Sequence, residues 1–157
     1  MQTSLGSASK NGLVTIKTGC KLNLFLNICC LREDGYHELE TLFYPLAKPF
    51  DELTIEPKST PGLDLHCPSR PGLSAENTTL HKALKAFNLA AGVDWGFKIC
   101  LNKQVPVGAG LGGGSANAAG FLNYLNAQAG NKSLPFPQLV KVAAGVGADV
   151  QIGRAHV

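Results

Sequence analysis

Short apolar runs in the first two thirds of the chain predict extended strands. The expected strands cover residues 13–16, 21–31, 40–46, 51–56, 63–66 and 97–101. The run 21–31 is almost continuously apolar, which predicts a buried strand. Asp34-Gly35 predicts the reversal that follows this run, because both residues tolerate the left-handed conformation of a tight turn. A loop rich in proline and glycine at 57–62 separates two later strands.

Three segments have apolar residues at the spacing of amphipathic helices. The first lies between Asn77, the expected cap, and Gly92, and the second covers 115–128. The third has Pro137 in its first turn, where proline is tolerated, and ends at Gly145 or Gly147. Because the strands come in a group and do not alternate regularly with helices, the expected fold class is α+β.

Composition bounds the class of protein. The chain has 157 residues, of which 45% are hydrophobic and 16% charged, as expected for one globular domain. The net charge of +3 comes from scattered basic residues, which is too weak a signal for nucleic acid but suits a phosphorylated ligand. No apolar run approaches the ~20 residues of a membrane-spanning helix. Residues 1–12 are expected to be a disordered tail, and they contain no arginine that would indicate a transit peptide.

The five cysteines are Cys20, Cys29, Cys30, Cys67 and Cys100. Their number is odd and no Cys-x-x-Cys pair occurs, so free thiols in a reducing cytosol are expected. We interpret them as small core residues and not as catalytic or metal-binding groups. The expected location is cytoplasmic, of bacterial type, with a plastid left open.

A glycine-rich stretch carries the strongest chemical signal. Five of the seven residues at 108–114 are glycine, and the stretch runs from the end of an expected strand into a helix of small residues. Glycines let the backbone approach a ligand closely, and the amino end of a helix offers unpaired N–H groups to an anion. A phosphate-binding loop is therefore predicted, the alternative being a flexible linker. The loop lacks the lysine of a Walker A motif, and its position late in the chain argues against a dinucleotide-binding Rossmann loop.

Polar residues in apolar surroundings carry the second signal. By strand alternation Lys21, Asn23 and Phe25 share one face, although an unpaired buried charge is costly. A solvated lysine on an edge strand is the alternative. Taken alone, His37 would be an ordinary surface histidine and Asp149 an ordinary turn residue.

Four motifs in order resemble the GHMP kinase superfamily, and within it the diphosphocytidyl-methylerythritol kinases. They are Lys21-Leu-Asn-Leu-Phe-Leu, Asp34-Gly-Tyr-His, Pro106-Val-Gly-Ala-Gly-Leu-Gly-Gly-Gly-Ser and Gly147-Ala-Asp-Val. The resemblance extends from about Lys17 to Val150. Ala109 and Ala116 depart from the family, which often has glycine and serine there, and we expect both changes to be tolerated.

The resemblance implies a GHMP kinase N-terminal domain over residues 13–151, with the ribosomal protein S5 domain 2-like fold, a mixed sheet packed with helices. It implies ATP-dependent phosphorylation of the 2-hydroxyl of 4-diphosphocytidyl-2-C-methyl-D-erythritol in the non-mevalonate isoprenoid pathway, with ATP and Mg²⁺ as cofactors. Alternatives are another GHMP kinase acting on a sugar, homoserine or mevalonate, a nucleotide-binding module without chemistry, and a Rossmann oxidoreductase. No nucleic-acid or membrane partner is implied, and the oligomeric state stays open.

The resemblance also assigns roles. Asp149 would accept the proton of the substrate hydroxyl, and Lys21 would stabilise the transferring phosphoryl group. Asn23 would position the substrate, Tyr36 would stack on its cytosine and His37 would hydrogen-bond the edge of that base. Residues expected to bind ATP are Pro106, Val107, Gly108, Ala109, Gly110, Leu111, Gly112, Gly113, Gly114, Ser115, Ala116, Lys103 and Asn77. Ser115 is expected near the metal or the phosphates, and no metal ligand is assigned.

The last six residues, Ile152-Gly-Arg-Ala-His-Val157, do not resemble the family, which continues with proline after Gly-Ala-Asp-Val. They match the translation of a common sequencing adapter, ATC-GGA-AGA-GCA-CAC-GTC. The adapter begins with the bases AG before these codons, and a C from the gene in front of that AG gives CAG, the codon for Gln151. We interpret 152–157 as adapter-derived and the C-terminal domain of the kinase as missing. Genomic DNA that continues in frame through these codons would contradict this interpretation. Such a fragment is expected to expose apolar surface, to be poorly soluble and to be inactive.

Overall fold

Side chains that alternate between buried and more exposed along residues 14–20, 51–56, 62–66 and 96–102 place one face of a sheet against the core. The strands are β1 (Val14–Leu31), β2 (His37–Lys58), β3 (Gly62–His66) and β4 (Gly96–Asn102). The structure, a computed structural model, describes residues 12–31, 35 and 37–150. The expectations for the tail at 1–11, for Tyr36 and for the segment 151–157 lie outside these residues.

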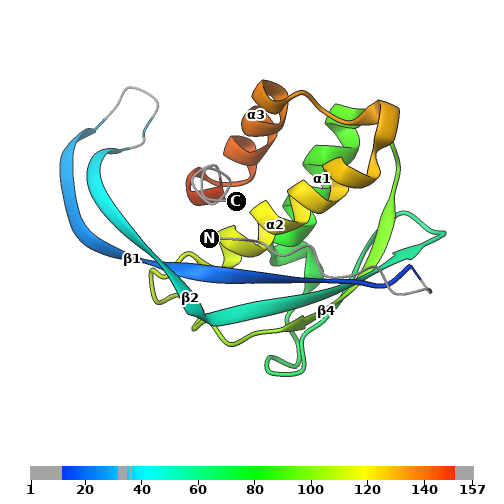
Figure 1. The fold of residues 1–157 in the computed structure, drawn as a ribbon, viewed down its shortest axis with the longest axis horizontal. Coiled ribbons are helices and arrows are strands. Elements are labelled where there is room, and N and C mark those ends of the chain that lie inside the picture. Colours follow the sequence, from blue (N-terminus) through cyan, green and yellow to red (C-terminus); the bar gives the residue numbers. More distant parts are fainter. Residues whose placement is uncertain (1–11, 32–34, 36, 151–157) are drawn as a thin grey trace.

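The sheet has the order β1-β2-β4-β3. The β1–β2 and β2–β4 pairs are antiparallel and the β3–β4 pair is parallel, so the sheet is mixed. Three helices, α1 (Thr79–Ala91), α2 (Gly113–Gln128) and α3 (Phe136–Val146), lie on one side of it (Figure 1). The core forms between these layers, where Phe97 of β4 meets Phe121 of α2 edge to face at 5.7 Å between ring centroids. This confirms the predicted α+β class.

The helix boundaries correct two sequence predictions. Asn77 does not cap α1. It lies in a short 3-10 turn, Ala75–Asn77, and Thr78 is the cap, because its extended backbone brings its hydroxyl oxygen to accept from His81 N at 3.3 Å. Helix α2 starts at Gly113, two residues before the predicted start, because the left-handed Gly112 (φ 69°) turns the chain into the helix. No helix in the described part of the chain is long and apolar enough to span a bilayer.

The first two strands are longer and more exposed than predicted. The expected strands 13–16 and 21–31 join into β1, and 40–46 and 51–56 join into β2. Irregular pairing between Thr18 and Cys20 lets both strands continue through the bend that separates these segments. Of the turn predicted at 32–35, only Gly35 lies within the described residues.

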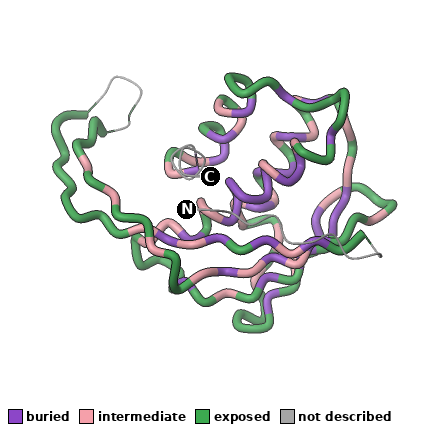
Figure 2. The backbone as a smooth tube through the Cα atoms, viewed as in Figure 1, coloured by how far each residue is buried: buried purple, intermediate pink, exposed green. Residues whose placement is uncertain are grey.

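Residues 22–31 and 37–46 form an extension of β1 and β2, here called the arm, which curves away beyond the helices (Figure 1). Every described residue of 22–31 is exposed, so the predicted burial of this run is wrong (Figure 2). The reason is that the helices cover only the other end of β1, where Val14, Ile16 and Cys20 are buried. The exposed large apolar residues of the arm are Leu22, Leu24, Phe25, Leu26, Ile28, Leu31, Leu39, Leu42 and Tyr44.

All five cysteines are free thiols in the structure. Cys20 and Cys67 are buried, as the interpretation of cysteine as a core residue requires. Cys29, Cys30 and Cys100 are exposed, and the interpretation is wrong for these three. The first two lie on the arm, and Cys100 lies on the sheet face opposite the helices.

Candidate functional site

The glycine-rich loop joins the end of β4 to the start of α2, as predicted. Gly108, Gly110 and Gly112 have φ values of 75°, 72° and 69°, a left-handed conformation that other residues adopt at a cost. Residues 106–110 are exposed. The N–H groups of the first turn of a helix have no partner within the helix, and its dipole is positive at this end. Loop and helix start together can bind an anion such as a phosphate group.

Lys21 lies directly beneath this loop. Its backbone N–H donates to the carbonyl oxygen of Leu111 at 3.0 Å. A Cβ atom on Gly112 would lie only 3.1 Å from Cε and 3.2 Å from Cγ of Lys21. The loop therefore packs against the aliphatic part of the lysine, and a glycine is required at position 112 both for its conformation and for this close approach.

The ammonium group of Lys21 contacts groups from β1, from β2 and from the segment after α3. It lies 3.3 Å from Oδ2 of Asp149, donates to Oδ1 of Asn23 at 3.2 Å and lies 4.0 Å from the ring centroid of Phe43. The Lys21 side chain is only 18% exposed, whereas that of Asp149 is 45% exposed. The structure thus brings together Lys21 and Asp149, which the sequence places at opposite ends of the chain. The ammonium group is partly shielded and the carboxylate faces solvent.

Phe43 was missed by the sequence analysis. It pairs with Asn23 across the β1–β2 ladder, which places its ring on the face of Lys21. Strand alternation predicts Phe25 on this face, but a register shift between Asn23 and Phe25 interrupts the alternation. Both strands are predicted from the sequence, so the missing information was their register.

Asn77 and Lys103 also lie close to the loop. The hydroxyl of Thr79, the first residue of α1, donates to the carbonyl oxygen of Gly114 at 2.7 Å. The starts of α1 and α2 therefore adjoin, and the exposed Asn77 lies two residues before this contact. Lys103 donates to the fully buried Asp51 at 2.5 Å. Asp51 has no role in the sequence analysis, because a single aspartate at the start of a predicted strand gives no signal.

Two other residues predicted for the site lie in different surroundings. His37 pairs with Leu31 at the far end of the arm and is exposed, so the structure does not bring it to Lys21. Ser115 is half-buried in the first turn of α2. Within the described ranges, no group of three His, Cys, Asp or Glu side chains lies in an arrangement that could hold a metal ion.

Cys20, next to the candidate lysine in sequence, is not a candidate nucleophile. Its thiol is buried and lies 3.5 Å from the carbonyl oxygen of Pro49, to which it donates. Burial, and secondly the negative charge of Asp51, raise the pKa of the Cys20 thiol above its ordinary value of 9.0. A thiol that keeps its proton at neutral pH is a poor nucleophile.

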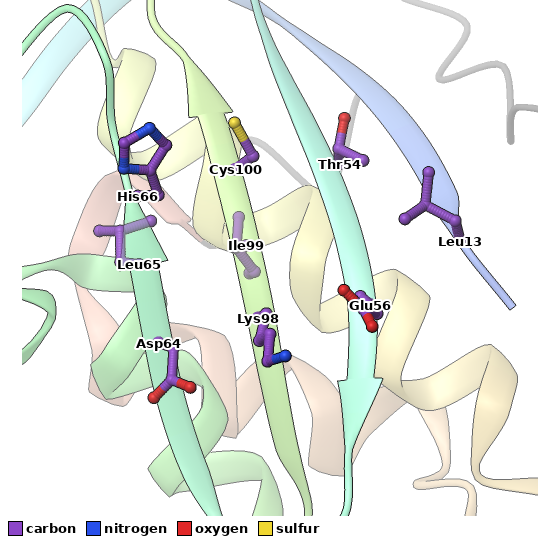
Figure 3. A pocket seen from close by; sticks show the side chains of 9 residues that line it. All are labelled: Leu13, Thr54, Glu56, Asp64, Leu65, His66, Lys98, Ile99 and Cys100. Atoms are coloured by element: carbon purple, nitrogen blue, oxygen red, sulfur yellow. The ribbon is translucent and has the colours of Figure 1, made fainter.

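A pocket on the opposite side of the sheet contains none of the predicted site residues (Figure 3). Side chains of β2, β3 and β4 that point away from the helices line it, among them Glu56, His66 and Cys100. The glycine loop and Lys21 therefore define the candidate site, and this pocket does not belong to it.

Comparison with known proteins agrees with the geometry. Residues 78–156, half of the chain, match the family described as the GHMP kinases N terminal domain. The chain belongs to the GHMP kinase family. A GHMP kinase relative from Oleidesulfovibrio alaskensis, named 4-diphosphocytidyl-2-C-methyl-D-erythritol kinase, is 48% identical over 136 residues. The match covers 87% of this chain and 41% of the relative, so this chain spans less than half of that relative's length.

Two solved structures share the fold of this chain. A crystal structure of 4-(cytidine 5'-diphospho)-2C-methyl-D-erythritol kinase superposes with a TM-score of 0.73 at 36% identity, covering 90% of this chain and 49% of that one. A homoserine kinase from Cytophaga hutchinsonii superposes with a TM-score of 0.58 at 20% identity, covering 88% and 42%. The second likeness concerns the fold alone. The family match and the first of these structures confirm the predicted fold of a GHMP kinase N-terminal domain.

Proposed function

We propose that this chain is the N-terminal, ATP-binding part of a kinase that phosphorylates the 2-hydroxyl of 4-diphosphocytidyl-2-C-methyl-D-erythritol. The observation that carries the proposal is the approach of the Lys21 ammonium to the Asp149 carboxylate, 3.3 Å, directly beside a glycine loop suited to phosphate. Relatives and a structural neighbour that carry the name of this kinase support the choice of substrate.

Phosphoryl transfer needs positioning and charge neutralisation more than covalent chemistry. In the proposed reaction Asp149, whose carboxylate is partly exposed, accepts the proton of the attacking hydroxyl. Lys21 stabilises the negative charge on the transferring group, and its hydrogen bond to Asn23 orients the ammonium. Asn23 is then also available to position the substrate, because it lies beside the lysine on the exposed part of β1.

The glycine loop and the first turn of α2, residues 106–116, wrap the phosphates of ATP in this proposal. Asn77 and Lys103 line the adenosine side, since both lie next to the start of α2. When bound, Mg²⁺ neutralises charge on the phosphates. Mg²⁺ is commonly held by a few protein oxygens and by the phosphates themselves, so the hydroxyl of Ser115, in the first turn of α2, is the group of this chain that fits it.

In this proposal the arm binds the cytidyl end of the substrate. Asn23 and His37 lie at opposite ends of the arm, and the eight steps along the strand from Asn23 to Leu31 span roughly 25 Å. A substrate with a reacting hydroxyl at one end and a base at the other can extend along such a surface. His37, and Tyr36 outside the described residues, are proposed to bind that base.

The decisive experiment extends the chain to the length of its relatives and measures ADP formation that depends on the cytidyl substrate. Asp149→Asn is expected to lower kcat about a hundred- to ten-thousandfold, the usual contribution of a general base, with nucleotide affinity little changed. Asp64→Asn, on the opposite sheet face, is the matched control and keeps full activity.

Three outcomes would contradict the proposal. Full turnover by Asp149→Asn would show that Asp149 is not the base. Faster turnover with homoserine or mevalonate would favour another GHMP kinase activity. An extended wild-type chain that binds ATP without any turnover would instead indicate a binding module. The 157-residue chain alone is expected to be inactive, and ATP turnover by it would refute that expectation.

A further inference from the structure

Asp51, at the position where β2 re-enters the core, is fully buried and lies at the centre of a polar cluster. Its Oδ1 atom accepts hydrogen bonds from the backbone N–H groups of Gln104 and Val105, both at 2.8 Å. Its Oδ2 atom accepts from Nζ of Lys103 at 2.5 Å and from Nδ2 of Asn117 at 3.0 Å. One carboxylate therefore satisfies four donors, which is what a buried charge needs to be tolerated.

These donors lie on both sides of the glycine loop. Residues 103–105 precede it, and Asn117 follows it in α2. The two ends also touch, since a Cβ atom on Gly113 would lie 2.8 Å from Cγ1 of Val105. The segment 106–112 is thus closed into a loop whose two ends are joined through Asp51.

The orientation of the Asn117 amide is set by Thr18. The hydroxyl of Thr18 lies 2.5 Å from Oδ1 of Asn117, to which it donates, so the amide nitrogen is left to donate to Asp51. Thr18 is also the register partner of Asp51 across the β1–β2 ladder. Strand β1, which carries Lys21, is therefore connected to the same cluster.

We infer that Asp51 is a positioning residue that presets the glycine loop for nucleotide phosphates. The inference rests on the proposed function only in naming the ligand. Asp51 is fully buried and acts through the loop, without contact to the nucleotide. A loop whose ends are held in place loses less conformational freedom on binding, and the fraction of molecules ready to bind is higher.

An asparagine at position 51 is nearly the same shape but has the wrong hydrogen-bonding pattern. Its amide oxygen can accept from Gln104 and Val105, but its NH₂ group would face the donors of Lys103 and Asn117. Asp51→Asn therefore breaks the contact to α2 and keeps the contacts to the backbone before the loop. Exchanging the two side chains, in Asp51→Asn with Asn117→Asp, returns a carboxylate to the cluster. The NH₂ group at position 51 can then donate to the carboxylate at position 117, which restores the link to α2, and only the Lys103 ammonium has to turn towards the new position of the charge.

The test uses the full 157-residue chain and two measurements. The first is the affinity for ADP by calorimetry, and the second is hydrogen exchange of the backbone amides at 107–115 without nucleotide. If Asp51→Asn lowers the competent fraction of loops to about a tenth, the apparent Kd rises about tenfold. Amide exchange also accelerates, because the open state of the loop is then the more populated one. The exchanged double variant is expected to recover most of both effects. Asp64→Asn is the matched control, because it removes the carboxylate of another Lys–Asp pair, 2.6 Å from Lys58, far from the loop.

The inference is overturned if a folded Asp51→Asn chain keeps the parent's loop exchange. It is also overturned if exchange in the double variant remains as fast as in the single one. A parent chain that binds no ADP counts against the proposed kinase function, and loop exchange then decides the role of Asp51 by itself. If Asp51→Asn does not fold, Thr18→Val removes only the hydroxyl that orients Asn117, and unchanged loop exchange in that variant overturns the inference.

Discussion

Replacing Gly112 by alanine tests how closely the phosphate loop packs on Lys21. Gly112 has a φ of 69°, and a Cβ atom added to it would lie 3.1 Å from Cε and 3.2 Å from Cγ of the lysine. Alanine therefore introduces two separate costs, one in the backbone and one in the contact. Gly110→Ala is the matched control, because Gly110 has a φ of 72° but a Cβ atom there would meet nothing within 4 Å.

The backbone cost is about 1–2 kcal/mol in each variant, the penalty for a residue with a Cβ in the left-handed region. The contact cost arises because the lysine stem must shift by a few tenths of an ångström. That shift disturbs an ammonium placed 3.2 Å from Oδ1 of Asn23 and 3.3 Å from Oδ2 of Asp149. Asp149 is nearly half exposed, so solvent screening weakens its ion pair with Lys21. The expected cost of disturbing the contacts of Lys21 is therefore about 1 kcal/mol.

A double-mutant cycle between Gly112→Ala and Lys21→Ala isolates this term. Truncating the lysine removes Cγ and Cε, so the contact vanishes while the backbone and helix-capping costs at position 112 remain. We expect a coupling energy of about 1 kcal/mol between Gly112→Ala and Lys21→Ala. The effects of Gly110→Ala and Lys21→Ala are expected to add within about 0.3–0.5 kcal/mol. Urea unfolding followed by the fluorescence of Trp95, the single tryptophan, supplies the free energies. Equal coupling in the two cycles would refute the close packing of loop on lysine.

Three further perturbations have definite expected outcomes. Phe43→Leu removes the aromatic face from the Lys21 ammonium, which is expected to lower the free energy of unfolding by about 0.5–1 kcal/mol in addition to the effect on packing. A double-mutant cycle with Lys21→Met measures the part that comes from the ammonium–ring contact. Because burial, the larger cause, raises the pKa of the Cys20 thiol, the unfolded chain releases this proton first as pH rises past about 9. Stability therefore falls above that pH, and Cys20→Ala makes the fall less steep in denaturant titrations. Leu24→Thr on the apolar arm reduces self-association in sedimentation experiments, whereas Leu89→Thr on the exposed side of α1 does not.

Local patterns were enough to predict the helices, β4 and the position of the glycine loop. Each of these depends on residues close in sequence, such as Gly92, whose left-handed conformation (φ 62°) ends α1. The approach of Lys21 to Asp149 was predicted from the resemblance to GHMP kinases, since neither residue signals a partner more than a hundred positions away. The family thus supplied the long-range information that periodicity lacks.

What could not be predicted depends on how distant segments pair. A continuous apolar run such as 22–31 predicts burial, but the sequence does not say how much of a strand the helices cover. The place of Phe43 beside Lys21 depends on strand register, and a one-residue slip would turn its ring to the other face. The role of Asp51 requires four donors from two other segments, and only the folded chain brings them together.

The glycine loop can lie close to Lys21 because α2 packs closely on β1 at two glycines, Gly112 at its N-cap and Gly120 within the helix. At Gly120 a Cβ atom would lie 2.8 Å from Cγ2 of Thr18 and 3.3 Å from Cδ1 of Ile16, so the helix backbone rests directly on β1 there. At Gly112 the helix start rests on the lysine stem in the same way. A larger residue at position 120 would lift α2 from the strand and carry the loop away from the ammonium. Gly120 has an ordinary helical conformation, so its importance follows from packing between α2 and β1 and not from its own backbone.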